Sequence, residues 1–205
     1  MADPILGKRT LDKYISHREW DNNKLKEDQK IFKRWARSLD GEWANTKETE
    51  LTSNFYDQIL VQVLGYKEGP DHRYTMAIEN RTKTSAQRPD VVLGNFTETD
   101  HDQPRALIEF ESPYTPLDSH GKGVEQAFSY QSQYKKPVRW IIASNFRYTR
   151  IYDRTREHVE EFSIKKLAAS KSEIQKFIFF LGADSIIHFN SDSKSSVIYS
   201  CISKV

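Results

Sequence analysis

RPDVVL at residues 88–93 and ALIEFE at residues 106–111 decide how this chain folds. Each stretch holds a short apolar run that turn residues bound, which predicts two buried strands joined as a hairpin. Asp90 then begins the first strand, and Glu109 and Glu111 end the second. Side chains two residues apart share a face of a strand, so Glu109 and Glu111 lie on the same side. The pattern therefore predicts three carboxylates at one edge of a sheet.

Clustered carboxylates of this kind indicate a magnesium site. Mg²⁺ prefers oxygen ligands and keeps several waters, and it activates water and neutralises charge on a phosphodiester. Glu109 directly follows three apolar residues, and an unpaired buried carboxylate is costly unless a cation accompanies it. We therefore expect Asp90 and Glu109 to bind Mg²⁺, with Mn²⁺ able to substitute.

The rest of the chain predicts an α/β fold. Leu51, Phe55, Ile59 and Val63 recur every fourth residue, which predicts a helix over residues 47–64 that ends at Gly65. The order of elements predicts a central mixed β-sheet flanked by helices, with helical additions at both ends. The remaining segments are expected as one or two helices within 10–40, strands at 74–79, 138–144 and 148–152, a helix at 124–134, a helical section at 162–181 and a loop at 190–196.

These blocks resemble the PD-(D/E)xK nuclease superfamily. Pro89-Asp90, the hairpin and Glu109-Phe110-Glu111 match its core motif, and QAFSY at residues 126–130 fits the QxxxY helix of one branch. The two following strands and the helix before the core resemble the N-terminal endonuclease domain of type IIG restriction–modification enzymes, also seen in type I subunits. The resemblance implies a helical arm over 1–44, a nuclease core over 45–165, and a helical segment with a tail over 166–205.

The resemblance also implies roles for individual residues. Asp90 would be the bridging metal ligand, Glu109 a second ligand, and the carbonyl of Phe110 a further oxygen. Glu48, on the first core helix, either reaches the metal or only complements the helix dipole. Two further residues, Gln126 and Tyr130, lie one helical turn apart, and either touch the substrate or orient the catalytic strand, or else serve ordinary packing.

Glu111 departs from the family, which normally has lysine at this position. A carboxylate cannot supply positive charge to the transition state, but it can accept a proton from water or share in metal binding. Lys122 and Lys83 are candidates for a lysine that has migrated from the motif. Loss of catalysis is the remaining alternative.

The resemblance implies Mg²⁺-dependent hydrolysis of double-stranded DNA, held mainly through phosphate contacts. Arg81, Lys83, Arg88 and Lys122 flank the acidic cluster and are the expected DNA-binding residues. A methyltransferase or specificity module is an expected partner, and a homodimer is one option because cutting both strands usually needs two sites. Two rival interpretations stay open: a catalytically silent domain that binds DNA or a partner subunit, and a small structural adaptor.

Composition narrows the alternatives. The 205 residues carry a net charge of +2, which is too mild to indicate nucleic acid by itself. The chain has a single cysteine, Cys201, and no recognisable signal peptide or membrane span, which favours a location in the cytoplasm. The resemblance to restriction enzymes implies that this is the cytoplasm of a prokaryote. The widely spaced histidines argue against zinc, and no Gly-rich phosphate loop or other organic-cofactor site is recognised.

Overall fold

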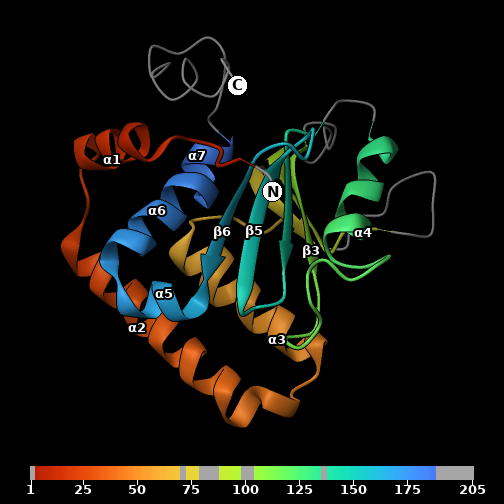
Figure 1. Cartoon of the computed structure of the whole chain (residues 1–205), viewed down its shortest axis with the longest axis horizontal. Helices are drawn as coiled ribbons and strands as arrows, with labels where there is room; N and C mark the ends of the chain where they lie inside the picture. The colour runs from red at the N-terminus through yellow and green to blue at the C-terminus, as the bar shows by residue number, and fades with distance from the viewer. Residues whose placement is uncertain (1–2, 70–72, 79–87, 98–103, 135–137, 188–205) are drawn as a thin grey trace.

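The computed structural model describes residues 3–69, 73–78, 88–97, 104–134 and 138–187. Its centre is one mixed sheet of six strands in the order β1-β2-β3-β4-β5-β6, with helices on both faces (Figure 1). The predicted α/β architecture, with helices at both ends of the chain, is confirmed. The strands are β1 Tyr74–Ile78, β2 Val91–Phe96, β3 Pro104–Phe110, β4 Trp140–Ser144, β5 Tyr148–Asp153 and β6 Val159–Ser163.

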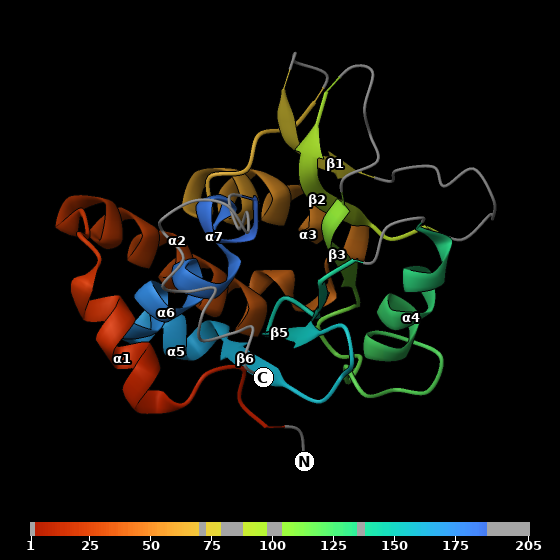
Figure 2. The same cartoon turned by 90° about the horizontal axis from the view of Figure 1, so that it is seen from above.

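The helices divide unequally between the two faces. Helix α4 lies on one side of the sheet, and α2, α5, α6 and α7 lie on the other (Figure 2). The α-helices are α1 Lys8–His17, α2 Asn22–Asp40, α3 Glu48–Phe55, α4 Val124–Ser129, α5 Ile164–Ala169, α6 Lys171–Leu181 and α7 Ala183–Ile187. Three further helical segments are not α-helical. They are the 3₁₀-helices η1 Glu42–Asn45 and η3 Tyr130–Gln133 and the π-helix η2 Tyr56–Val63.

The predicted hairpin is present. Strands β2 and β3 pair antiparallel, with Val91 opposite Ile108. Strand β3 then pairs parallel with β4, with Phe110 opposite Ser144, and α4 lies in the connection between them. Parallel neighbours need such a crossover, so the residues that follow β3 begin a long loop at the carboxyl ends of two strands.

Alternation along the strands builds a separate core on each face. Val92 and Leu107 pack with α4 in one cluster, whereas Val91 and Ile108 pack with the helices of the other face. Glu109 comes two residues after Leu107, so its side chain lies on the α4 face. The carboxylate therefore meets a sparse layer made of one short helix, and not the thicker helical layer behind the sheet.

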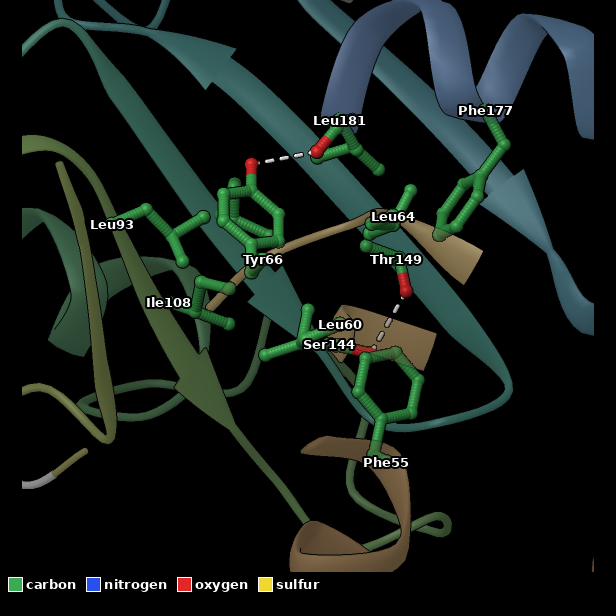
Figure 3. Close-up of a pocket in the computed structure, with 11 residues that line it drawn as sticks. Phe55, Leu60, Leu64, Tyr66, Leu93, Ile108, Ser144, Thr149, Phe177 and Leu181 are labelled. Atoms are coloured by element: carbon green, nitrogen blue, oxygen red, sulfur yellow. Dashed lines mark hydrogen bonds between the residues drawn. The ribbon is translucent and has the colours of Figure 1, made fainter. Parts of the chain in front are cut away.

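The core on the face opposite α4 is the larger of the two, and it is closely packed. Its small internal cavity, about 10 Å³, is lined by apolar side chains from η2, the central strands and α6 (Figure 3). The polar groups at its wall are paired, because the hydroxyls of Ser144 and Thr149 lie 2.9 Å apart and the Tyr66 hydroxyl donates to the carbonyl of Leu181 at 2.7 Å. A space of this size holds about one water molecule.

The helix predicted over residues 47–64 is confirmed, but it changes geometry partway. It is α-helical in α3 and a π-helix in η2, where the N–H of Leu64 donates to the carbonyl of Ile59. The wider turn brings both Ile59 and Leu60, and then both Val63 and Leu64, into the core. An apolar residue at every fourth position does not distinguish an α-helix from this arrangement.

The helical section predicted over 162–181 is wrong at its start. Residues 159–163 form strand β6, antiparallel to β5, and helices begin only at Ile164. Glu160 of this strand is buried, and its charge is paired with that of Lys176 of α6, with 2.7 Å between Nζ and Oε2. A buried glutamate hides the alternation that would otherwise mark a strand.

The one or two helices predicted within residues 10–40 are α1 and α2. Helix α2 packs into the larger core through Leu25, Phe32 and Trp35. The indole N–H of Trp35 also donates to Gln58 of η2 at 2.9 Å. This segment therefore packs against the rest of the chain.

Short segments accompany both outer strands. Asp3 forms an isolated parallel bridge with His158, beside β6. Glu68 forms a second parallel bridge with Met76 of β1.

Within the part of the chain that the structure describes, no helix is both long and apolar enough to cross a membrane. The loop predicted at 190–196 lies outside the described residues.

Candidate functional site

Asp90 is fixed to the end of the neighbouring strand. It lies in the bend just before β2, where Pro89 limits the backbone to extended conformations for the preceding residue. Its Oδ2 accepts a hydrogen bond of 2.7 Å from the backbone N–H of Phe110. The hairpin register thus holds this carboxylate beside the last residues of β3.

Glu109 is the most perturbed carboxylate of the site. It is 4% exposed, and its Oε2 makes no hydrogen bond within the described residues. The pKa of Glu109 is raised to about 9, mainly by burial and further by the negative charges of Asp90 and Glu111. A backbone hydrogen bond from Asp90 acts in the opposite direction without outweighing these effects. A buried oxygen with no donor, surrounded by like charge, is an environment that a cation would stabilise.

Glu111 is buried and closes the loop that follows it. Its backbone N–H donates to the carbonyl of Ser144 at 2.8 Å, which extends the pairing of β3 and β4 by one residue. Its Oε1 accepts a hydrogen bond of 2.8 Å from the N–H of Gly123, immediately before α4. The loop of residues 112–123 is therefore held at both ends by the same glutamate.

Glu48 reaches the same cluster from a different layer. It is the first residue of α3, where a carboxylate also complements the helix dipole. Burial, then the charges of Glu111 and Asp90, raises the pKa of Glu48. Lys122 and a backbone hydrogen bond from Ser112 act in the opposite direction. Four carboxylates thus lie within electrostatic range of one another.

Gln126 and Tyr130 interact directly on α4 and η3. The Nε2 of Gln126 donates to the Tyr130 hydroxyl at 2.9 Å, and the tyrosine is buried. Burial raises the pKa of Tyr130, and the negative charges of Glu109, Asp90 and Glu111 add to that effect. The structure therefore places this pair beside the carboxylates, on the α4 face of the sheet.

The predicted basic residues differ in how they are placed. Lys122 is exposed and lies close enough to Glu48 to lower its pKa. Arg88 is half-buried, and its Nε has no hydrogen-bond partner among the described residues. Arg81 and Lys83 lie outside the described residues.

Phe110 has a structural role besides the predicted one. Its ring stacks on Phe146 at 5.3 Å between centroids and meets Phe55 edge-on at 5.2 Å. This aromatic cluster joins β3 to α3 and to the β4–β5 turn. It fixes the position of the backbone that separates Glu109 from Glu111, although its carbonyl as a metal ligand stays a prediction.

A second acidic group was missed by sequence reasoning. Asp153, Glu157 and His158, at the β5–β6 turn, each place a ligand atom within 4.8 Å of the others, as a metal site requires. Within the described residues, Glu109 and the three carboxylates around it do not form so tight a group. Considering histidine spacing alone hid the turn cluster, whereas the spacing D-x-x-x-E-H across a hairpin turn would have indicated it.

The turn cluster is satisfied by internal hydrogen bonds. Asp153 Oδ2 lies 3.0 Å from His158 Nδ1 and accepts from the Thr155 hydroxyl at 2.8 Å. Burial raises the pKa of Asp153, but these hydrogen bonds outweigh burial and the net shift is downward. Its geometry suits a metal ion, but both oxygens of Asp153 already have donors. At the acidic cluster, by contrast, Oε2 of Glu109 has no donor among the described residues.

No protein-family model and no curated protein matches this sequence. One solved structure, a cryo-EM structure of a DrdV–DNA complex, contains a chain that this one resembles in architecture. The sequence identity is 16% and the TM-score is 0.46, with 75% of this chain and 96% of that chain covered.

Proposed function

We propose that this protein is a Mg²⁺-dependent endonuclease of the restriction type, which hydrolyses phosphodiester bonds in double-stranded DNA. The observation that carries the proposal is Glu109, a buried carboxylate with one oxygen that lacks a donor and with other carboxylates around it. Strongly perturbed groups of this kind gather at catalytic sites. The sequence resemblance to PD-(D/E)xK nucleases supports the same reaction.

The donor set fits a hard divalent cation. Asp90 and Glu109 would hold it, with Glu48 and the Phe110 carbonyl as further oxygen ligands. When bound, Mg²⁺ would neutralise charge on the phosphate and would lower the pKa of a water molecule that it binds. Mn²⁺, which accepts the same oxygen ligands, is expected to substitute.

Two residues of this chain replace the lysine of the family motif. Glu111 accepts a proton from the attacking water, because the hydrogen bond from Gly123 uses only one of its carboxylate oxygens. Lys122 supplies the positive charge, because its ammonium group already lies close enough to lower the pKa of Glu48. Arg88 and Lys122 bind backbone phosphates, so DNA binding weakens as salt increases.

The test is cleavage of supercoiled plasmid in Mg²⁺ and in Mn²⁺. Asp90→Asn is the variant of choice, because asparagine keeps an oxygen that can accept from the Phe110 N–H but removes the charge. Glu157→Gln, in the turn cluster, is the matched control. Nicking that needs metal, disappears in Asp90→Asn and persists in Glu157→Gln supports the proposal. Cleavage that Asp90→Asn retains would refute it.

A second candidate function is a catalytically silent domain that binds DNA or a partner subunit. The hydrogen bond from Gly123 to Glu111 favours it, because this glutamate then has a structural role in place of the catalytic lysine. Glu111→Lys separates the two candidates. DNA cleavage by Glu111→Lys, with an inert native protein that still binds DNA in a gel shift, would establish the silent domain.

A further inference from the structure

A shallow groove opens beside the loop of residues 112–123. It encloses about 320 Å³ and lies between that loop and the β4–β5 turn. Among the described residues, three large hydrophobic side chains are exposed, and two of them, Tyr114 at 61% and Tyr148 at 44%, line this groove. The third, Val61, lies elsewhere on η2. Exposed aromatic rings gathered in a hollow indicate a binding surface.

The two sides of this tyrosine groove are fastened together. Asn145 donates from Nδ2 to the carbonyl of Thr115 at 2.9 Å and accepts at Oδ1 from the N–H of Tyr148 at 2.8 Å. The guanidinium carbon of Arg147 lies 5.3 Å from the centroid of the Tyr114 ring. The rings are therefore held on a prepared backbone, and binding would cost little ordering of the loops.

The tyrosine groove and the acidic cluster share their framework. The loop that carries Tyr114 starts at Glu111 and returns to it through the hydrogen bond from Gly123. The turn that leads to Tyr148, the first residue of β5, starts after Ser144, whose carbonyl accepts from the Glu111 N–H. A polymer bound at the carboxylates would therefore have the tyrosines as its neighbouring surface.

The charges of the tyrosine groove select the chemistry of its occupant. Arg150 is paired with Asp118 at 2.9 Å and with Glu161 at 2.6 Å. Arg147 is paired with Asp40 at 2.7 Å and also donates to the carbonyl of Leu39. Both arginines already have acidic or carbonyl partners, so the groove is poorly suited to phosphate. Its exposed rings suit a flat, uncharged group.

We propose that the tyrosine groove binds an unpaired nucleobase adjacent to the phosphodiester at the acidic cluster. This inference rests on the proposed function and adds to it a preference for double-stranded DNA that has an unpaired stretch beside the bond. A base inside a duplex has both faces covered by its neighbours, whereas an unpaired base offers a face to an aromatic ring. Stacking of this kind tolerates any base, so the groove confers a preference for strand structure and not for sequence.

The test measures binding without cleavage, in buffer with chelator, by fluorescence anisotropy of labelled DNA. The full chain is titrated with a blunt duplex and with the same duplex carrying an unpaired tail. The tailed DNA is expected to bind more tightly. Tyr114→Ala and Tyr148→Ala should each weaken binding of tailed DNA by roughly tenfold, and leave blunt-duplex binding unchanged. A 2-aminopurine in the tail should be quenched by the native protein.

Matched variants separate stacking from other effects. Tyr114→Phe and Tyr148→Phe keep the rings and should bind tailed DNA as the native chain does, and Val61→Ala controls for loss of an exposed apolar side chain. Native-like binding by both alanine variants overturns the proposal, and so does a groove that binds a proline-rich peptide but no tailed DNA. Because the assay needs no cleavage, failure of the groove is distinguishable from failure of the nuclease, which the plasmid assay decides.

Discussion

The carboxylate of Glu111 accepts a hydrogen bond from the backbone N–H of Gly123, with 2.8 Å between Oε1 and N. The bond closes a loop whose ends are brought together at the carboxyl end of β3. Gly123 has a φ of 51°, in the left-handed region, and a Cβ there would lie 2.7 Å from the carbonyl oxygen of Leu117. The loop therefore needs glycine where it meets the glutamate.

Gly123→Ala should lower the free energy of unfolding by about 1–3 kcal/mol, because it combines backbone strain with a clash. Gly121→Ala is the matched control, since Gly121 has a φ of 70° but has open space around its Cβ position. Urea unfolding monitored by circular dichroism gives both values. Equal losses in the two variants would contradict a role for the contact with Leu117.

The stability of the metal-free protein should fall as the pH rises from about 5 to about 9. Burial and neighbouring charge raise the pKa of Glu109 from 4.5 to about 9, so the folded protein holds a proton that the unfolded chain releases. The stabilisation is full below the unfolded pKa and is lost as the pH rises through the folded one. Thermal unfolding of Glu109→Gln should show a weaker dependence on pH over this range.

Mg²⁺ should counteract that loss. Because a cation competes with the proton for the carboxylate, the increase in Tm on adding Mg²⁺ should be larger at high pH than at low pH. Differential scanning fluorimetry with and without Mg²⁺ measures this. A pH-independent increase, or the same increase in Glu109→Gln, would place the ion elsewhere on the molecule.

Lys122→Ala should reduce the rate of single-turnover DNA cleavage by roughly a hundredfold, because a charge that stabilises the transition state is removed. Lys122→Arg keeps the charge and should retain more of the activity. An exposed lysine of α5, Lys166, provides the control substitution to alanine. If Lys122→Ala cleaves at the native rate, the missing motif lysine is not supplied by this residue.

Tyr66→Phe should cost about 1–2 kcal/mol of unfolding free energy, because the buried hydroxyl donates to the carbonyl of Leu181, which then loses its partner. The exposed Tyr148→Phe should be neutral. Guanidinium unfolding of both variants makes the comparison. A neutral Tyr66→Phe would mean that the carbonyl finds another donor.

The strands that carry the carboxylates were predictable because their signals are local. Apolar runs bounded by turn residues gave the hairpin, and the alternation placed Glu109 and Glu111 on one side. Strand β6 was not predictable, because Glu160 is buried through Lys176, which is distant in sequence. The π-helical turn was hidden for a similar reason, since contacts with distant parts of the core decide that both Ile59 and Leu60 are buried.

The carboxylates of the site could be predicted from the sequence, but the loop contacts that surround them could not. Asp90 and Glu109 could be paired from the hairpin alone, and the structure adds their electrostatic coupling. The bond from Gly123 and the groove around Tyr114 depend on how a loop folds back, which no periodicity encodes. Loop conformation follows from such long-range contacts, and a single sequence contains little information about them.

The parallel bridges at Asp3 and Glu68 have a consequence for aggregation. An outer strand with unpaired N–H and carbonyl groups is a template on which another chain can add a strand. Here the carbonyl of Asp3 accepts from Val159 and its N–H donates to Glu157, while the carbonyl of Lys67 accepts from Thr75 and Met76. Each flank of the sheet thus has part of its pairing capacity taken by its own chain. Removing the residues around Asp3 would free that capacity at β6 and promote sheet-to-sheet polymerisation.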